Sequence, residues 1–134
     1  MKQVELAERI AREAHHGQKD KSGVDYIEHP RRIADALRDE DAKAVAWLHD
    51  VLEDTPMTPK ALSDAGIDSR IICAVLCLTR KSTETYKQFI ERIASNGDRL
   101  AVQVKLADLQ DNLRPGCPDE MRERRYLPAI TRLQ

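Results

Sequence analysis

Apolar and polar residues follow one another along this chain with the period of an α-helix. Residues 4–15 repeat apolar or small side chains three and four positions apart, and Gly17 ends that stretch. No stretch shows the strict alternation that is typical of a half-buried strand. The pattern therefore predicts an all-α fold, with further helices at residues 30–37, 42–53, 59–64, 71–78, 83–94, 99–112 and 119–133.

Caps and breakers mark the helix ends. Pro30 and Pro59 fit the first turn of a helix, where the missing backbone N–H costs nothing. Thr58 and Asp98 have side chains that accept hydrogen bonds from the first free N–H groups of the helices that follow them. Pro56 ends the helix predicted at residues 42–53.

The composition limits the class of protein. A chain of 134 residues suits a single domain, residues 1–134, with one core. Aromatic residues make up only 4%, so that core should be aliphatic. Twenty-two basic residues against 23 acidic ones argue against binding of a nucleic-acid polymer. No apolar run is long enough to span a membrane, and the start lacks a signal peptide, so we expect a cytoplasmic protein.

Three cysteines are present. Cys73 and Cys77 lie in the apolar segment 71–78, and Cys117 lies in a loop rich in proline and glycine. We expect the first two to be small, buried core residues with reduced thiols, and we expect no disulfide. Their spacing of four residues leaves metal binding as the alternative.

The chemistry of the chain is concentrated in an ordered set of histidines and aspartates. His29 is followed by the adjacent pair His49 and Asp50, and then by Asp108. Imidazole nitrogens and carboxylate oxygens are ligands for Mn, Fe, Zn or Ni, and such a site needs no cysteine. The set predicts a divalent metal site, and the alternative is that the acidic residues are solvated surface charges.

Two further carboxylates follow the His-Asp pair. Glu53 and Asp54 lie four residues beyond His49 and Asp50, so in a continuous helix they would share faces with those residues. That position favours orienting an attacking water molecule and supplying a proton to the leaving oxygen. The chain therefore has the pattern of a metal-dependent hydrolase.

Several polar residues are candidates for binding a substrate. Lys105 and Asn112 share one side of the predicted helix with Asp108. Lys21 and Ser22 lie in the loop before His29, where a lysine suits a phosphate. His15 and His16 end the first helix, and they cap it or support the site.

These residues stand in strings that resemble the HD-domain superfamily of metal-dependent phosphohydrolases. The strings are similar to those of the hydrolase domain of RelA/SpoT enzymes and of their small stand-alone relatives. They are Ala14-His15-His16-Gly17-Gln18, Ser22-Gly23-x-x-Tyr26-Ile27-x-His29-Pro30, Leu48-His49-Asp50-Val51-Leu52-Glu53-Asp54-Thr55 and Val104-Lys105-Leu106-Ala107-Asp108-x-x-x-Asn112.

The resemblance implies an HD-domain helical bundle that binds Mn²⁺ or another divalent transition metal. It implies removal of pyrophosphate from the 3′ position of (p)ppGpp, a small nucleotide. On this resemblance His29, His49, Asp50 and Asp108 hold the metal, Glu53 and Asp54 handle the water and the proton, and Asn112 contacts the nucleotide.

The chain departs from the family where the base is recognised. The long enzymes usually carry an arginine that packs against guanine at the position of Asp20, and a threonine at the position of Pro115. From a length of 134 residues we expect no synthetase domain. The alternatives are therefore an HD-domain phosphatase or pyrophosphatase of another nucleotide specificity, or a catalytically silent nucleotide-sensing module. A homo-oligomer stays open.

Overall fold

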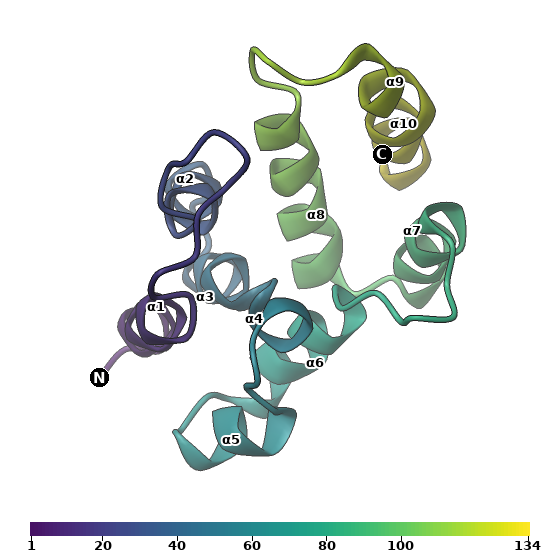
Figure 1. Ribbon diagram of the computed structural model, residues 1–134. Coiled ribbons are helices and arrows are strands. Elements are labelled where there is room, and N and C mark those ends of the chain that lie inside the picture. Colours follow the sequence, from purple (N-terminus) through teal and green to yellow (C-terminus); the bar gives the residue numbers. More distant parts are fainter.

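The computed structural model describes residues 1–134, and all of its regular structure is helical (Figure 1). The only β-type pairing is an isolated bridge between Lys19 and Asp25. The all-α prediction is therefore confirmed. The elements are α1 (Gln3–Ala14), α2 (Glu28–Asp35), α3 (Glu40–Leu48), α4 (Val51–Asp54), α5 (Pro59–Asp64), α6 (Ser69–Cys77), α7 (Tyr86–Asn96), α8 (Arg99–Asn112), α9 (Asp119–Met121), the π-helical turn η1 (Arg122–Tyr126) and α10 (Leu127–Leu133).

The core is built around α3. Its residues from Ala44 to Leu48 are all buried, which is the pattern of a helix enclosed on every side. Helices α1, α2, α6 and α8 pack against it, and α8 in turn contacts α7 and α10 (Figure 1). Trp47 and Phe89 are the only buried aromatic side chains among the apolar core residues, so the predicted aliphatic core is confirmed. None of the helices is both long and apolar enough to span a bilayer.

The predicted caps hold the helix starts. Thr58 accepts a hydrogen bond from the backbone N–H of Ala61, and Asp98 accepts one from that of Ala101. Asp39 caps α3, and Thr85 forms a capping box with Gln88 at the start of α7. These local bonds place the ends of the helices close to where the pattern of apolar residues put them.

The helix predicted at residues 42–53 is interrupted, and this prediction was wrong in its detail. Helix α3 ends at Leu48, and α4 starts again at Val51. Asp50, between them, has φ −108° and ψ 1°, in the bridge region of the backbone map, where many active-site residues lie. Because of the interruption, the His49 and Asp50 side chains point toward one another, whereas neighbours on a straight helix point about 100° apart.

The last predicted helix contains a widened turn. Residues 119–133 remain helical, but η1 makes a π turn just before Pro128. Proline has no backbone N–H and its ring crowds the carbonyl four residues earlier, so the normal helical ladder cannot pass through this point.

The cysteine prediction is half correct. Cys77 is buried, but Cys73 is exposed, and no cysteine is in a disulfide. Cys73 lies two residues from both Ile71 and Val75, which are buried, and a step of two residues leads to the opposite side of a helix. The prediction that both thiols are buried was therefore wrong for Cys73.

A partly buried arginine, Arg92, holds the loop between α6 and α7. The Arg92 guanidinium donates to the Glu84 carboxylate, with its Nε 2.7 Å from Glu84 Oε2. It also donates to the carbonyls of Cys77 and Thr79, both at 3.0 Å. Glu84 accepts in addition from the backbone N–H of Lys81. The loop that carries Arg80 is thus fixed at both of its ends.

Replacing this arginine tests its role in stability. The hydrogen bond from Arg92 lowers the pKa of Glu84 to about 2 from an ordinary 4.5. The pair therefore stabilises the fold above about pH 4.5, and the stabilisation is lost as pH falls toward 2. We predict that Arg92→Gln lowers the free energy of unfolding by about 1–3 kcal/mol at pH 7, because several hydrogen bonds to a charged group disappear.

The measurement is urea unfolding at pH 7 and pH 3. The difference between wild type and Arg92→Gln should shrink at the lower pH. Arg132→Gln is the matched control, because Arg132 pairs with Glu91 on the surface and its loss should cost less than about 0.5 kcal/mol. A difference that stays constant with pH would contradict the role assigned to the pair.

Candidate metal centre and its two cavities

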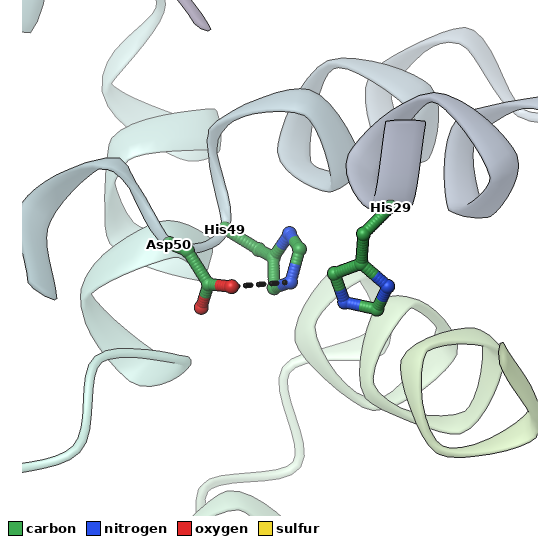
Figure 2. A group of neighbouring side chains, drawn as sticks. All are labelled: His29, His49 and Asp50. Carbon is green, nitrogen blue, oxygen red and sulfur yellow. Dashed lines mark ion pairs between the residues drawn. The ribbon is translucent and has the colours of Figure 1, made fainter. Parts of the chain in front are cut away.

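Three segments bring their histidines and aspartates together at the centre of the molecule. His29 comes from α2, His49 and Asp50 come from the joint between α3 and α4, and Asp108 comes from α8. One ligand atom each of His29, His49 and Asp50 lies within 4.8 Å of the others (Figure 2). Asp108 Oδ1 lies 2.9 Å from His29 Nε2 and 3.8 Å from His49 Nε2. All four predicted ligands are therefore side by side.

Both imidazole rings are held by their outer nitrogen. His49 Nδ1 donates to the Ala46 carbonyl at 2.7 Å, and His29 Nδ1 donates to the Asp111 carboxylate at 2.6 Å. A carbonyl and a carboxylate can only accept here, so each Nδ1 carries a hydrogen. The Nε2 atom of each ring is left facing the cluster, as metal-binding histidines require.

The charges in the cluster are strongly coupled. Burial alone would lower the pKa of His49, but Asp50 and Asp108 outweigh it and raise that pKa to about 9. Burial alone would raise the pKa of Asp50, but His49 lowers it to about 2. Lys105, only 2.8 Å from Asp108, helps to hold the pKa of that buried carboxyl well below its usual range. Both carboxylates are thus kept ionised inside the core.

The residues fit a divalent cation. His49 Nε2 is buried and has no hydrogen-bond partner, although Asp50 Oδ2 lies 3.1 Å away. A buried polar atom without a partner is costly, and a metal ion would satisfy it. Two imidazoles and two carboxylates form a donor set for a first-row transition metal.

The two carboxylates beyond the cluster lie at its edge. Asp50, Glu53 and Asp54 have carboxylate oxygens within 4.8 Å of one another. Glu53 accepts a hydrogen bond from the backbone N–H of Arg80 at 2.8 Å. Both Glu53 and Asp54 reach solvent, but partial burial, with the charge of Asp50 added to it, raises the pKa of each.

The cluster separates two cavities. The larger one, of about 480 Å³, is lined by residues of the 20–26 loop, α2, the end of α8 and the 114–121 segment, including Lys21, Ser22 and Asn112. The smaller one, of about 130 Å³, lies on the side of α6, α7 and η1. Asp50 and Asp108 line both cavities, whereas Glu53 lines only the smaller and Asp54 only the larger.

Helix α8 crosses from one cavity to the other. Lys105 lines the smaller cavity, Asn112 lines the larger, and Asp108 lies between them. The Lys105 ammonium pairs with Asp108 and lies over the rings of Tyr86 and Phe89. Lys105 and Asn112, which the spacing puts on one side of the helix with Asp108, therefore face different cavities.

Known proteins resemble this chain in both sequence and fold. No family model matches it. The chain is 36% identical over 119 residues to a guanosine-3′,5′-bis(diphosphate) 3′-pyrophosphohydrolase of Haemophilus influenzae, an alignment that covers 78% of this chain and 17% of that protein. It is 30% identical over 124 residues to the Aquifex aeolicus protein of the same name, covering 84% and 17%. It is also 44% identical over 62 residues to the bifunctional (p)ppGpp synthase/hydrolase SpoT of Escherichia coli, covering 43% and 9%.

This chain is a relative of the RelA/SpoT hydrolases. A solved structure of a metazoan orthologue of SpoT that hydrolyses ppGpp has the same fold, with a TM-score of 0.77 and 24% identity over 99% of this chain and 84% of that one. The chain spans only about a sixth of the length of the first two bacterial relatives.

Four residues support the cluster: Asp111, Tyr26, Gln18 and His15. The sequence alone assigned the first three no role in the site, and for His15 it indicated helix capping or support of the site. Asp111, which aligns His29, also accepts from Arg32 at 2.8 Å. The Tyr26 hydroxyl donates to the Asp50 carboxylate. His15 is buried, its Nδ1 lies 3.0 Å from Gln18 Oε1, and Gln18 donates to the Asp54 carbonyl at 3.2 Å. The strings shared with the RelA/SpoT hydrolases contain His15, Gln18 and Tyr26, and that was the available signal.

The loop residue Asp20 has a structural role of its own. Its Oδ1 accepts hydrogen bonds from the backbone N–H groups of Ser22 and Val24. Asp20 thus shapes the loop that presents Lys21 and Ser22 to the larger cavity. His16, in contrast, is exposed at the end of α1, and it takes no part in the cluster.

Removing one ligand tests the metal centre. We predict that purified wild-type protein holds one divalent ion per chain and that His49→Ala loses it, because His49 Nε2 faces the cluster and is buried there without a hydrogen-bond partner. Elemental analysis after dialysis measures the occupancy. His16→Ala is the control, since that ring is exposed and should leave the metal content unchanged. Full occupancy in His49→Ala would exclude this ligand set.

Proposed function

We propose that this protein is a metal-dependent phosphohydrolase that removes pyrophosphate from the 3′ position of (p)ppGpp. The observation that carries the proposal is the cluster of two imidazoles and two carboxylates between two cavities, with Glu53 facing the smaller cavity and Asp54 facing the larger. The names of the bacterial relatives and of the metazoan structure support this substrate. We further propose that residues 1–134 act as one hydrolase domain in the cytoplasm.

His29, His49, Asp50 and Asp108 would hold the ion, with Mn²⁺ as the proposed metal. A divalent cation would act as a Lewis acid toward a phosphoryl oxygen and make a neighbouring water more acidic. Asp111 and the Ala46 carbonyl orient the two imidazoles toward it. The Tyr26 hydroxyl fixes the Asp50 carboxylate in the same way.

Glu53 and Asp54 divide the proton transfers between the two cavities. Hydrolysis forms a bond from water oxygen to phosphorus and breaks the bond from phosphorus to the 3′ oxygen. With the nucleoside in the larger cavity, Asp54 lies on the side of the departing 3′ oxygen and Glu53 lies on the opposite side. Glu53 then takes the proton of the attacking water, and Asp54 supplies the proton to the 3′ oxygen. A raised pKa suits Asp54 for donation.

The larger cavity suits the nucleoside and its 5′ phosphates. Lys21, Ser22 and Asn112, which the sequence suggests for substrate binding, line this cavity, and Lys21 forms no ion pair with the protein, so its charge is free for a phosphate. Lys105 does not line this cavity, and its ammonium is already paired with Asp108, so its role is to stabilise that ligand.

A second candidate function is hydrolysis of a different nucleotide. Asp20 lines the larger cavity where the long relatives usually have an arginine for stacking on guanine. A carboxylate cannot stack on a base in that way. The absence of this stacking contact favours weaker discrimination between nucleotide bases than in the long relatives. A catalytically silent sensor is less well supported, because a sensor has no need of Glu53 and Asp54 beside the cluster.

Neutral replacements of these two carboxylates separate chemistry from metal binding. We predict that Glu53→Gln and Asp54→Asn each keep the metal and the fold and lower kcat by about 10² to 10⁴, the range for acid–base groups. Steady-state kinetics with elemental analysis measure both properties. Loss of the metal in either variant would make that residue a ligand instead.

The two roles differ in their dependence on the leaving group. A p-nitrophenyl phosphate ester needs no proton on its departing oxygen, so Asp54→Asn should be far less impaired with it than with a nucleotide. Glu53→Gln should be equally impaired with both. The reverse pattern would exchange the two assignments.

The substrate is tested by a release assay. We predict that the purified protein with Mn²⁺ releases pyrophosphate and GDP from ppGpp. A panel of nucleoside 5′-monophosphates, triphosphates and 3′-phosphorylated nucleotides shows how far other bases are accepted, with Asp50→Asn as the inactive control. Release of phosphate from simple nucleotides with no turnover of ppGpp would overturn the proposed substrate.

A further inference from the structure

The smaller cavity carries positive charge that no carboxylate of the protein pairs with. Three basic side chains line it, Arg80, Lys105 and Arg125. Lys105 pairs with Asp108, but neither Arg80 nor Arg125 forms an ion pair. Arg80 donates its Nε to the Glu84 carbonyl at 3.1 Å, and the Arg125 guanidinium lies 5.1 Å from the centre of the Tyr86 ring. The remaining N–H groups of both arginines are free for a ligand.

The larger cavity differs in this respect. Its two arginines, Arg32 and Arg114, both pair with Asp111, at 2.8 and 3.5 Å. Lys21 is its only basic residue without such a partner. An anion with more than one charge is therefore attracted more strongly to the smaller cavity, although the larger one has more room.

A buried hydroxyl also lacks a partner there. Tyr86 lines the smaller cavity, and its hydroxyl group is buried without any hydrogen bond to the protein. Such a group costs free energy unless something satisfies it, so it indicates a ligand that accepts or donates a hydrogen bond.

The π turn places Arg125 at this cavity. Arg125 lines the smaller cavity, while the next residue, Tyr126, lines the larger one. The wider turn before Pro128 thus presents two consecutive side chains to the two sides of the cluster. π turns inside helices frequently occur at functional sites.

We propose that Arg80, Tyr86 and Arg125 form a subsite for the terminal phosphate of a diphosphate group whose first phosphate lies at the metal centre. The inference rests on the proposed function. Guanidinium groups bind phosphate through charge-assisted hydrogen bonds, and the tyrosine hydroxyl adds a further donor. A volume of about 130 Å³ has room for several water molecules, which suits a phosphate but not a nucleoside.

The subsite makes the enzyme select a diphosphate over a monophosphate at the position that is hydrolysed. Until it dissociates, the pyrophosphate product keeps its terminal phosphate in contact with the two arginines. A substrate with a single 3′ phosphate would make no contact with them. The three residues of the subsite come from the α6–α7 loop, the start of α7 and η1, and these lie outside the strings shared with the RelA/SpoT hydrolases.

The experiment measures the binding of inorganic pyrophosphate and of inorganic phosphate to the Mn²⁺-loaded protein by isothermal titration calorimetry. Arg125→Gln and Tyr86→Phe are the test variants, because neither residue contacts a predicted ligand. Arg124→Gln is the matched control, since Arg124 is exposed beside Glu120 and lies outside the cavity. Circular dichroism and metal content establish that each variant is folded and loaded.

We expect Arg125→Gln to weaken pyrophosphate binding by about tenfold or more and Tyr86→Phe to weaken it less, because one loses a charged donor and the other a neutral one. Phosphate binding should not change in either variant, and Arg124→Gln should behave as wild type. Unchanged pyrophosphate binding in Arg125→Gln, or an equal loss of both anions, would overturn the subsite.

The same variants separate this inference from the proposed function. If wild type hydrolyses ppGpp and Arg125→Gln does so with unchanged kcat/KM, the subsite is wrong and the function stands. If the protein hydrolyses no nucleotide but binds pyrophosphate in a manner that depends on Arg125, the function is wrong and the anion site stands.

Discussion

The structure depends on keeping two carboxylates ionised inside an aliphatic core. Asp108 is almost fully buried, and Asp50 lies beside it at the end of the buried helix α3. An isolated charge in such surroundings is very costly, and it persists only with partners of opposite charge and with hydrogen bonds. His29, His49 and Lys105 surround the two carboxylates and supply both.

Much of the surrounding architecture serves this cluster. The interruption between α3 and α4 turns His49 and Asp50 toward one point, and α8 brings Asp108 to the same point from the opposite wall. Further contacts hold the proposed ligands in place, with Asp111 on His29 and Tyr26 on Asp50. Outer contacts of this kind orient metal ligands and tune them, and they come here from a loop and from helices that are far apart in sequence.

The two-sided arrangement distinguishes this site from a simple metal-binding pocket. Because Asp50 and Asp108 line both cavities, a substrate that reaches the cluster can extend into both. The larger cavity offers more room, and both of its arginines are paired with Asp111, whereas the two arginines of the smaller cavity form no ion pair. In the proposed function, Asp20, where the chain departs from the long RelA/SpoT relatives, lies on the nucleoside side, so selection of the base and selection of the phosphate group would reside in different parts of the chain.

The sequence by itself determined the helices, their caps and the identity of the cluster. Periodicity, Thr58, Asp98 and the prolines are local signals, and local hydrogen bonds decide helix ends regardless of the rest of the fold. The order His29, His49-Asp50, Asp108 predicted a metal site because histidines and aspartates in this arrangement are typical metal ligands.

Tertiary structure alone decided the remaining features. The break at Asp50 has no breaker residue, and contacts with Tyr26 and His49 accompany it. From its sequence position alone, Asp111 could be a solvated surface charge. The packing of α2 against α8 places it in hydrogen-bond contact with His29. The exposure of Cys73, the pairing of Lys105 and the meeting of Arg80 with Arg125 all depend on which helix faces are covered. Sequence spacing fixes the angle of a residue around its own helix, but not what lies opposite it.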